Sequence, residues 1–89
     1  MIVKITDYGK GDENFVDYTV KGLSEEQKKY LKDNLKEKIR DVGDDLVITL
    51  YFSDRLYPFQ SQTAQFRLDD FISREEIEMN VFLSSFLDI

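Results

Sequence analysis

The sequence of 89 residues contains no cysteine and no histidine. Without cysteine, the chain has no disulfide framework, no thiolate zinc site and no cysteine nucleophile. Without histidine, it lacks the most common general base and transition-metal ligand. A Gly-rich phosphate loop and a G-x-S-x-G motif are also missing from the sequence. These absences predict a protein that is not an enzyme and that holds no cofactor or metal.

Long apolar runs are absent as well. No stretch approaches the roughly 18 consecutive apolar residues that cross a bilayer. Residues 1–7 show no basic start followed by an apolar run, which a signal peptide would need. The expectation is a soluble, cytoplasmic protein that does not bind membranes.

Acidic side chains outnumber basic ones, and the net charge is −6. Residues 1–38 hold eight lysines and eight acidic residues, whereas residues 39–89 hold four arginines and ten acidic residues. The whole excess of negative charge therefore lies in the second half of the chain. It either serves solubility alone, or forms a face that repels nucleic acid and attracts basic protein surfaces.

The first half of the chain predicts a hairpin followed by a helix. The β-branched and aromatic segments 2–6 and 15–20 are typical of strands, with Gly and Asx turn residues between them. Ser24 and the glutamine three residues later form a capping-box pattern at a helix start. Apolar residues at helical spacing extend this predicted helix to Val42, before Gly43.

The second half predicts another hairpin and another helix. Segments 46–52 and 63–68 have strand patterns and would pair with each other. A second capping-box pattern begins at Ser73, and the following helix would continue through Phe86 or Leu87. The expected fold is therefore one α+β domain over residues 1–89, in the order ββαββα, with an antiparallel sheet packed by two helices.

Four aspartates flank the predicted second hairpin. If it forms, Asp44 and Asp45 lie near Asp69 and Asp70. The simplest interpretation assigns them to a turn and to a helix N-terminus, where aspartate is common. The alternatives are an acidic face for a basic partner and a hard-cation site, although the recognisable calcium loop is missing.

The segment 53–62 contains large side chains beside the only proline. Arginine and tyrosine are over-represented at binding hot spots, so Arg55, Tyr57 and Phe59 are candidate partner-binding residues. The alternative is that the apolar members of this segment fold back over the core.

The last predicted helix has more apolar surface than a small sheet can cover. Phe82 and Phe86 lie in its broad apolar arc, whereas Ile77 and Val81 lie outside that arc. These four residues predict self-association or a partner groove. Deeper burial of the helix is the alternative.

A stripe of Lys28, Lys32 and Lys36 marks the first predicted helix. It is typical of a solvated face, and the net charge of −6 argues against direct binding of nucleic acid.

Taken together, these patterns favour a non-catalytic, acidic protein-interaction module. Its physical type is that of small inhibitors, immunity proteins or DNA mimics that dock on a basic partner. The second hypothesis is a structural or accessory protein that forms a homodimer through its last helix.

Overall fold

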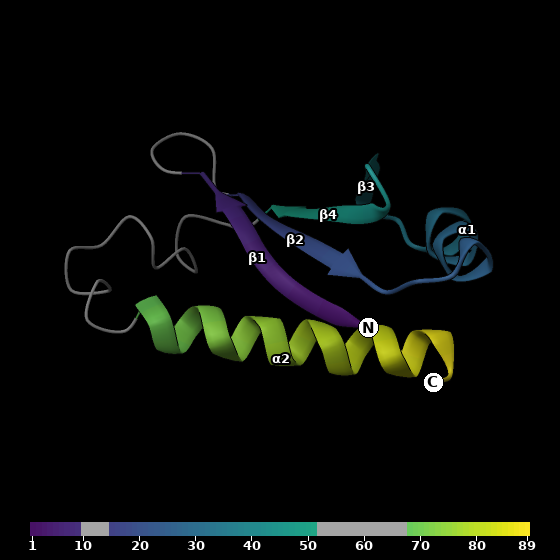
Figure 1. The fold of residues 1–89 in the computed structure, drawn as a ribbon. Coiled ribbons are helices and arrows are strands. Elements are labelled where there is room, and N and C mark those ends of the chain that lie inside the picture. Colours follow the sequence, from purple (N-terminus) through teal and green to yellow (C-terminus); the bar gives the residue numbers. More distant parts are fainter. Residues whose placement is uncertain (10–14, 52–67) are drawn as a thin grey trace.

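The computed structural model describes residues 1–9, 15–51 and 68–89 (Figure 1). Within them, the element order ββαββα confirms the predicted α+β class. The elements are β1 (Ile2–Tyr8), β2 (Phe15–Lys21), α1 (Glu25–Asn34), β3 (Lys38–Val42), β4 (Asp45–Tyr51) and α2 (Leu68–Leu87).

The strands form one antiparallel sheet in the order β1-β2-β4-β3. Among the described residues, β2 and β4 are therefore the central strands of the sheet, and β1 and β3 are its edge strands. Figure 1 shows α2 running along one face of the sheet, close to the start of β1, with α1 at one end of the sheet. The edge strand β1 and the long helix α2 thus lie next to each other.

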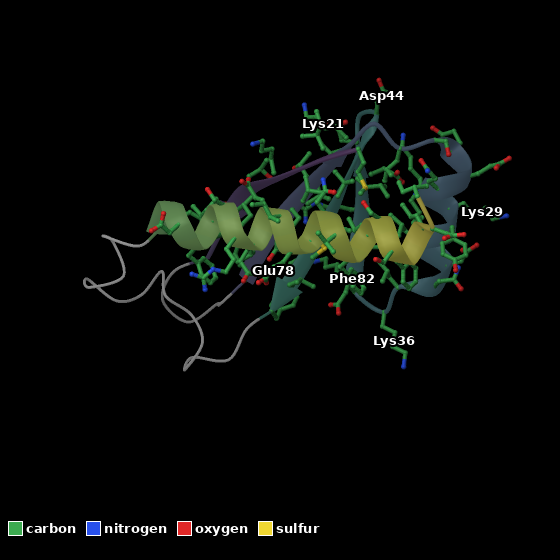
Figure 2. The ribbon with its side chains drawn as sticks, turned by 90° about the horizontal axis from the view of Figure 1, so that it is seen from below. Lys21, Lys29, Lys36, Asp44, Glu78 and Phe82 are labelled. Carbon is green, nitrogen blue, oxygen red and sulfur yellow. The ribbon has the colours of Figure 1, made fainter. Side chains whose placement is uncertain are left out.

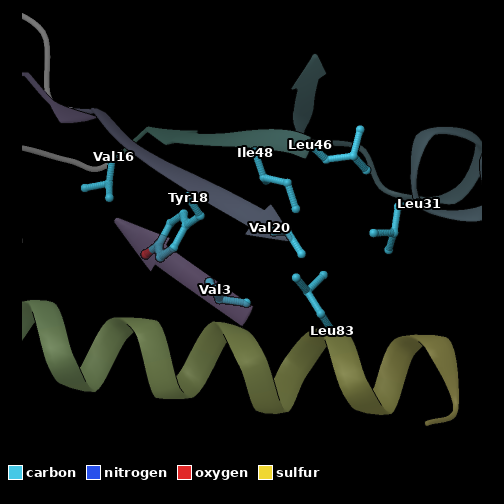
Figure 3. Packing of buried hydrophobic residues seen from close by; sticks show 8 residues of the cluster. All are labelled: Val3, Val16, Tyr18, Val20, Leu31, Leu46, Ile48 and Leu83. Carbon is cyan, nitrogen blue, oxygen red and sulfur yellow. The ribbon is translucent and has the colours of Figure 1, made fainter. Parts of the chain in front are cut away.

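The core lies between the sheet and α2. Alternating side chains of the central strands point toward this helix, as the two-residue period of a strand requires. Val16, Tyr18 and Val20 of β2 are fully buried. The apolar side chains of the buried cluster, drawn in Figure 3, are Val3, Val16, Tyr18, Val20, Leu31, Leu46, Ile48 and Leu83.

The predicted first hairpin and the start of the first helix are confirmed. Strands β1 and β2 pair in antiparallel register, with Val3 opposite Val20. At the start of α1, the Gln27 backbone N–H donates to Ser24 Oγ at 3.1 Å, and the Ser24 N–H donates to the Gln27 side chain at 2.9 Å. These reciprocal bonds are those of a capping box.

The predicted extension of this helix to Val42 is wrong. Helix α1 ends at Asn34, whose side-chain amide donates to the Tyr30 carbonyl at 2.8 Å. The following residues become extended and form β3. Gly43, with a φ of 61°, begins the two-residue turn between β3 and β4, a position that favours glycine. It is a hairpin turn and not a helix stop.

The predicted strand 46–52 corresponds to β4. In the described sheet its neighbours are β2 and β3, not the predicted partner 63–68. Residues 63–67 lie outside the described residues, and Leu68 is the first residue of α2. Ser73 therefore lies inside α2 and does not cap it.

Candidate protein-binding groove

The four predicted aspartates do not come together. Asp44 and Asp45 lie in and next to the β3–β4 turn, where Asp45 forms an ion pair of 3.7 Å with Lys21. Figure 2 places Asp44 toward the end of the molecule where α2 finishes. Asp69 and Asp70 belong to the first turn of α2, at the opposite end of that helix. The predicted cluster depended on a hairpin of 46–52 with 63–68, which the described sheet does not contain.

The described part of the chain contains no group of three or more carboxylates arranged to hold a metal ion. At the start of α2, the negative charge of Asp70 is favourable in itself, because the helix N-terminus carries a partial positive charge. The other predicted partner-binding residues, Arg55, Tyr57 and Phe59, lie outside the described residues.

The four predicted self-association residues lie on two different flanks of α2. Ile77 and Val81 belong to the flank that lines the space beside β1, and are 64% and 60% exposed. Phe82 lies on the flank away from β1 (Figure 2). The Phe82 ring stacks on the Phe86 ring, with 5.8 Å between the ring centroids. The Phe86 ring in turn lies against Tyr30 of α1, with 5.4 Å between the centroids. Phe86 is therefore used within the fold, whereas Ile77 and Val81 are available to a partner.

A groove of about 450 Å³ separates β1 from α2. Residues 1–4 form its strand wall, and its helix wall consists of Ser73, Glu76, Ile77, Asn80 and Val81. Ile2 of the strand wall is also exposed, at 55%, but it alternates with Val3 and therefore belongs to the sheet face away from α2. Apolar side chains and polar groups therefore meet in one concavity, as is typical of binding sites. We refer to this feature as the β1–α2 groove.

Glu76 connects the two walls of the β1–α2 groove. Its Oε2 accepts a hydrogen bond of 2.7 Å from the backbone N–H of Ile5. That N–H points away from β2, at the open edge of the sheet, so the carboxylate takes the place of a neighbouring strand. The sequence suggested only a local capping role for Glu76, and no local pattern signals its contact with Ile5.

Glu75 makes a second polar contact, beneath the helix. The Tyr18 hydroxyl donates to Glu75 Oε2 at 3.3 Å. Burial, together with the neighbouring charge of Glu75, raises the pKa of the Tyr18 hydroxyl far above its usual value. Burial, with the nearby charge of Glu78, also raises the pKa of Glu75. The first half of α2 is thus attached to the sheet through carboxylates.

The sheet face away from α2 carries a compact polar network. Asp17 lies on this face and is only 4% exposed. Its carboxylate accepts hydrogen bonds from the Thr49 hydroxyl at 2.5 Å and from the Arg40 guanidinium at 2.9 Å. Because these three residues come from β2, β4 and β3, the network joins three adjacent strands.

Two of the predicted lysines are engaged by carboxylates. Lys28 is buried and contacts Glu25 at 3.2 Å, and Lys32 forms an ion pair with Asp41 of β3. The Lys32–Asp41 pair connects α1 to β3, whereas the Lys28–Glu25 pair lies within α1. Neither helix that the structure describes has the length and apolar character needed to cross a membrane.

Comparison with known proteins identifies the family but no activity. Residues 2–88 match a family of unknown function, DUF5750, so the chain belongs to this family. No curated protein matches the sequence. The geometry of the described residues therefore supplies the argument for a function.

Proposed function

We propose that this member of the DUF5750 family is a non-catalytic protein-interaction module that binds its partner through the β1–α2 groove. The observation that carries the proposal is the exposure of Ile77 and Val81 beside the open edge of β1. Exposed apolar side chains rimmed by polar groups are typical of interaction sites, and sheet edges recruit further strands. The β1–α2 groove has both exposed apolar side chains and a sheet edge.

The proposed partner is a basic protein. The chain carries a net charge of −6, and one acidic residue of α2, Glu76, lines the groove. Such a charge steers basic surfaces toward the module and disfavours nucleic acid. An inhibitor that covers a basic surface of its target is one function of this class. In this proposal the acidic contribution comes from α2, and the turn that holds Asp44 and Asp45 is not required.

The test is the selection of linear peptides from a random displayed library. The selected peptides are then measured against wild type and an Ile77→Ser/Val81→Ser variant. We expect the variant to lose about tenfold or more in affinity, because two apolar contacts of roughly 1 kcal/mol each disappear. An Ile89→Ser variant is the control, since Ile89 is 63% exposed but does not line the groove.

Equal loss of affinity in the groove variant and in the Ile89→Ser control would contradict the proposal. A loss confined to an Asp44→Asn/Asp45→Asn variant would do so as well, and would move the binding surface to the β3–β4 turn. Circular dichroism of each variant checks that its fold is intact.

Self-association is the second candidate, because an open edge strand can pair with a copy of itself about a two-fold axis. Ile77 and Val81 of the two copies would then lie close to that axis. Repulsion between two chains of charge −6 opposes this arrangement. Sedimentation across micromolar to millimolar concentrations distinguishes the two candidates: a monomer supports the partner proposal, and a dimer abolished by Ile77→Ser/Val81→Ser supports self-association.

A further inference from the structure

A pocket of about 340 Å³ lies where the end of α2 meets α1. Three of its lining residues belong to α1 and three to the end of α2: Glu26, Gln27, Tyr30, Phe86, Leu87 and Asp88. None of them lines the β1–α2 groove. Sites for small ligands measure roughly 300–1,000 Å³, so this pocket has room for a single side chain rather than for a longer segment. We refer to it as the α1–α2 pocket.

Among the described residues, every charged side chain that lines the α1–α2 pocket is acidic. These side chains are Glu26 and Asp88, and neither forms an ion pair with a described residue. The C-terminal end of a helix carries a partial negative charge, and the last turn of α2 contains no basic residue to offset it. Lys29 is next to Tyr30 in sequence but does not line the pocket, and Figure 2 shows its side chain directed away from α2. The pocket therefore favours a cation.

The end of α2 fixes the backbone that carries the Asp88 carboxylate. Asp88 has a φ of 59°, in the left-handed region that aspartate and asparagine tolerate. Its N–H donates to the Ser85 carbonyl at 3.2 Å, and the Ile89 N–H donates to the Ser84 carbonyl at 2.9 Å. These two bonds are those of a Schellman motif. The Asp88 side chain thus starts from a defined position at the pocket.

Two aromatic rings of the α1–α2 pocket add to the recognition of a cation. The rings of Tyr30 and Phe86 are inclined by 58° to each other, with 5.4 Å between their centroids. Tyr30 is 48% exposed, so a ligand can reach its ring. The face of an aromatic ring is negative and attracts cations, and this attraction adds to that of the carboxylates.

Arginine fits this combination of groups better than lysine does. The guanidinium group is planar, stacks on aromatic rings and donates paired hydrogen bonds to a carboxylate. It is also less strongly hydrated than an ammonium group, so less hydration is lost when it enters a pocket. The net charge of −6 attracts a basic partner that carries such a side chain.

We propose that the α1–α2 pocket binds an arginine side chain of a partner protein. The guanidinium group lies against the rings of Tyr30 and Phe86 and pairs with the carboxylate of Glu26 or Asp88. This inference rests on the proposed function for the basic protein partner. The pocket and its ligand are separate from the β1–α2 groove, so they are tested without it.

The test uses Nα-acetyl-arginine methylamide and the corresponding derivatives of lysine and citrulline, whose side chain is a neutral analogue of that of arginine. Binding to the full chain is measured by NMR at constant ionic strength, through shifts of the Tyr30, Phe86 and Asp88 signals. We expect the arginine derivative to bind about tenfold more tightly than the citrulline derivative, and severalfold more tightly than the lysine derivative. Equal binding of arginine and citrulline, or a preference for lysine, would overturn the proposal.

Matched variants separate the two pocket carboxylates from the general charge of the protein. Glu26→Gln/Asp88→Asn removes both of them, and asparagine still tolerates the left-handed backbone at position 88. Glu37→Gln/Asp44→Asn removes the same charge at exposed positions that do not line the pocket. The preference for arginine over citrulline should fall severalfold in the first variant and change little in the second. Equal falls would overturn the role of the pocket carboxylates.

Two substitutions of Tyr30 test the contribution of its ring. Tyr30→Leu removes the aromatic face, whereas Tyr30→Phe keeps it and removes only the hydroxyl group. We expect severalfold weaker binding of the arginine derivative by Tyr30→Leu and nearly unchanged binding by Tyr30→Phe. The same loss in both variants would overturn the role of the ring. Circular dichroism checks that each variant keeps its fold.

The remaining outcomes distinguish this inference from the proposed function. The Ile77→Ser/Val81→Ser variant should bind the arginine derivative as wild type does, because neither residue lines the α1–α2 pocket. A loss of binding in this variant would place the ligand in the β1–α2 groove and overturn the inference. If the arginine derivative shifts none of the Tyr30, Phe86 and Asp88 signals, the inference fails, whereas the proposed function still depends on the peptides selected for the groove.

Discussion

Replacement of Asp17 with alanine is expected to destabilise the protein by about 2–4 kcal/mol. Asp17 is the only carboxylate with a buried side chain among the described residues. Hydrogen bonds to a charged group contribute about 1.5–3 kcal/mol, which we assign to the buried bond from Thr49. Arg40 is half exposed, and its ion pair adds at most about 1 kcal/mol, because water screens it.

The assay is a double-mutant cycle in urea, followed by circular dichroism. Asp17→Ala, Thr49→Val and the combined variant are compared with wild type. Each single change removes the same bond and leaves a buried polar group with only Arg40 as its partner. The sum of the two single losses should therefore exceed the loss of the double variant by about 1 kcal/mol or more.

Additive losses would refute this reasoning, since they would show that the two side chains contribute independently. An Asp17→Ala loss below about 0.5 kcal/mol would also refute it, because that is the usual range of an exposed substitution. Arg40→Ala serves as a further comparison, and its loss should stay near 1 kcal/mol.

Two further predictions concern the attachment of α2. Leu83→Ala should lower the free energy of unfolding by about 2–5 kcal/mol, because Leu83 is fully buried. Phe82→Ala should lower it clearly less, because Phe82 is half exposed. Urea unfolding measures both losses, and equal losses would contradict the packing. The pKa of Glu75 is raised in the folded state, so protonation of Glu75 favours folding. The contribution of Glu75 to stability therefore increases as the pH falls toward 4.5, and it is lost as the pH rises through the raised pKa. Glu75→Gln should remove this dependence, and parallel stability curves of the two proteins between pH 4.5 and 7.5 would contradict it.

Local patterns predicted the parts of the fold that depend on neighbours in sequence. The capping box at Ser24 and the hairpin of β1 and β2 need only adjacent residues, and both are present. The strand β3 was misread because Ile39 and Val42 follow Leu35 at helical spacing. Their conformation is decided by pairing with β4, in which Ile39 lies opposite Ile48. The conformation of residues 38–42 therefore depends on tertiary pairing, which a local sequence pattern does not show.

The groove could be foreseen only in part. The position of Ile77 and Val81 outside the main apolar arc of the helix was visible in the sequence, and it correctly identified exposed apolar residues. The other wall depends on β1 being an edge strand, which follows from the strand order. The contact between Ile5 and Glu76 spans 71 positions of the chain, so no local motif encodes it.

The place of Met1 in the groove has a practical consequence. Met1 lines the groove, and β1 begins at the next residue (Figure 1). Residues attached before Met1, such as an affinity tag, would start at the mouth of the groove. A short flexible tether gives such residues an effective concentration in the millimolar range, so a tag could act as an intramolecular competitor of a weak partner. A tag after Ile89 avoids this competition, because Ile89 does not line the groove.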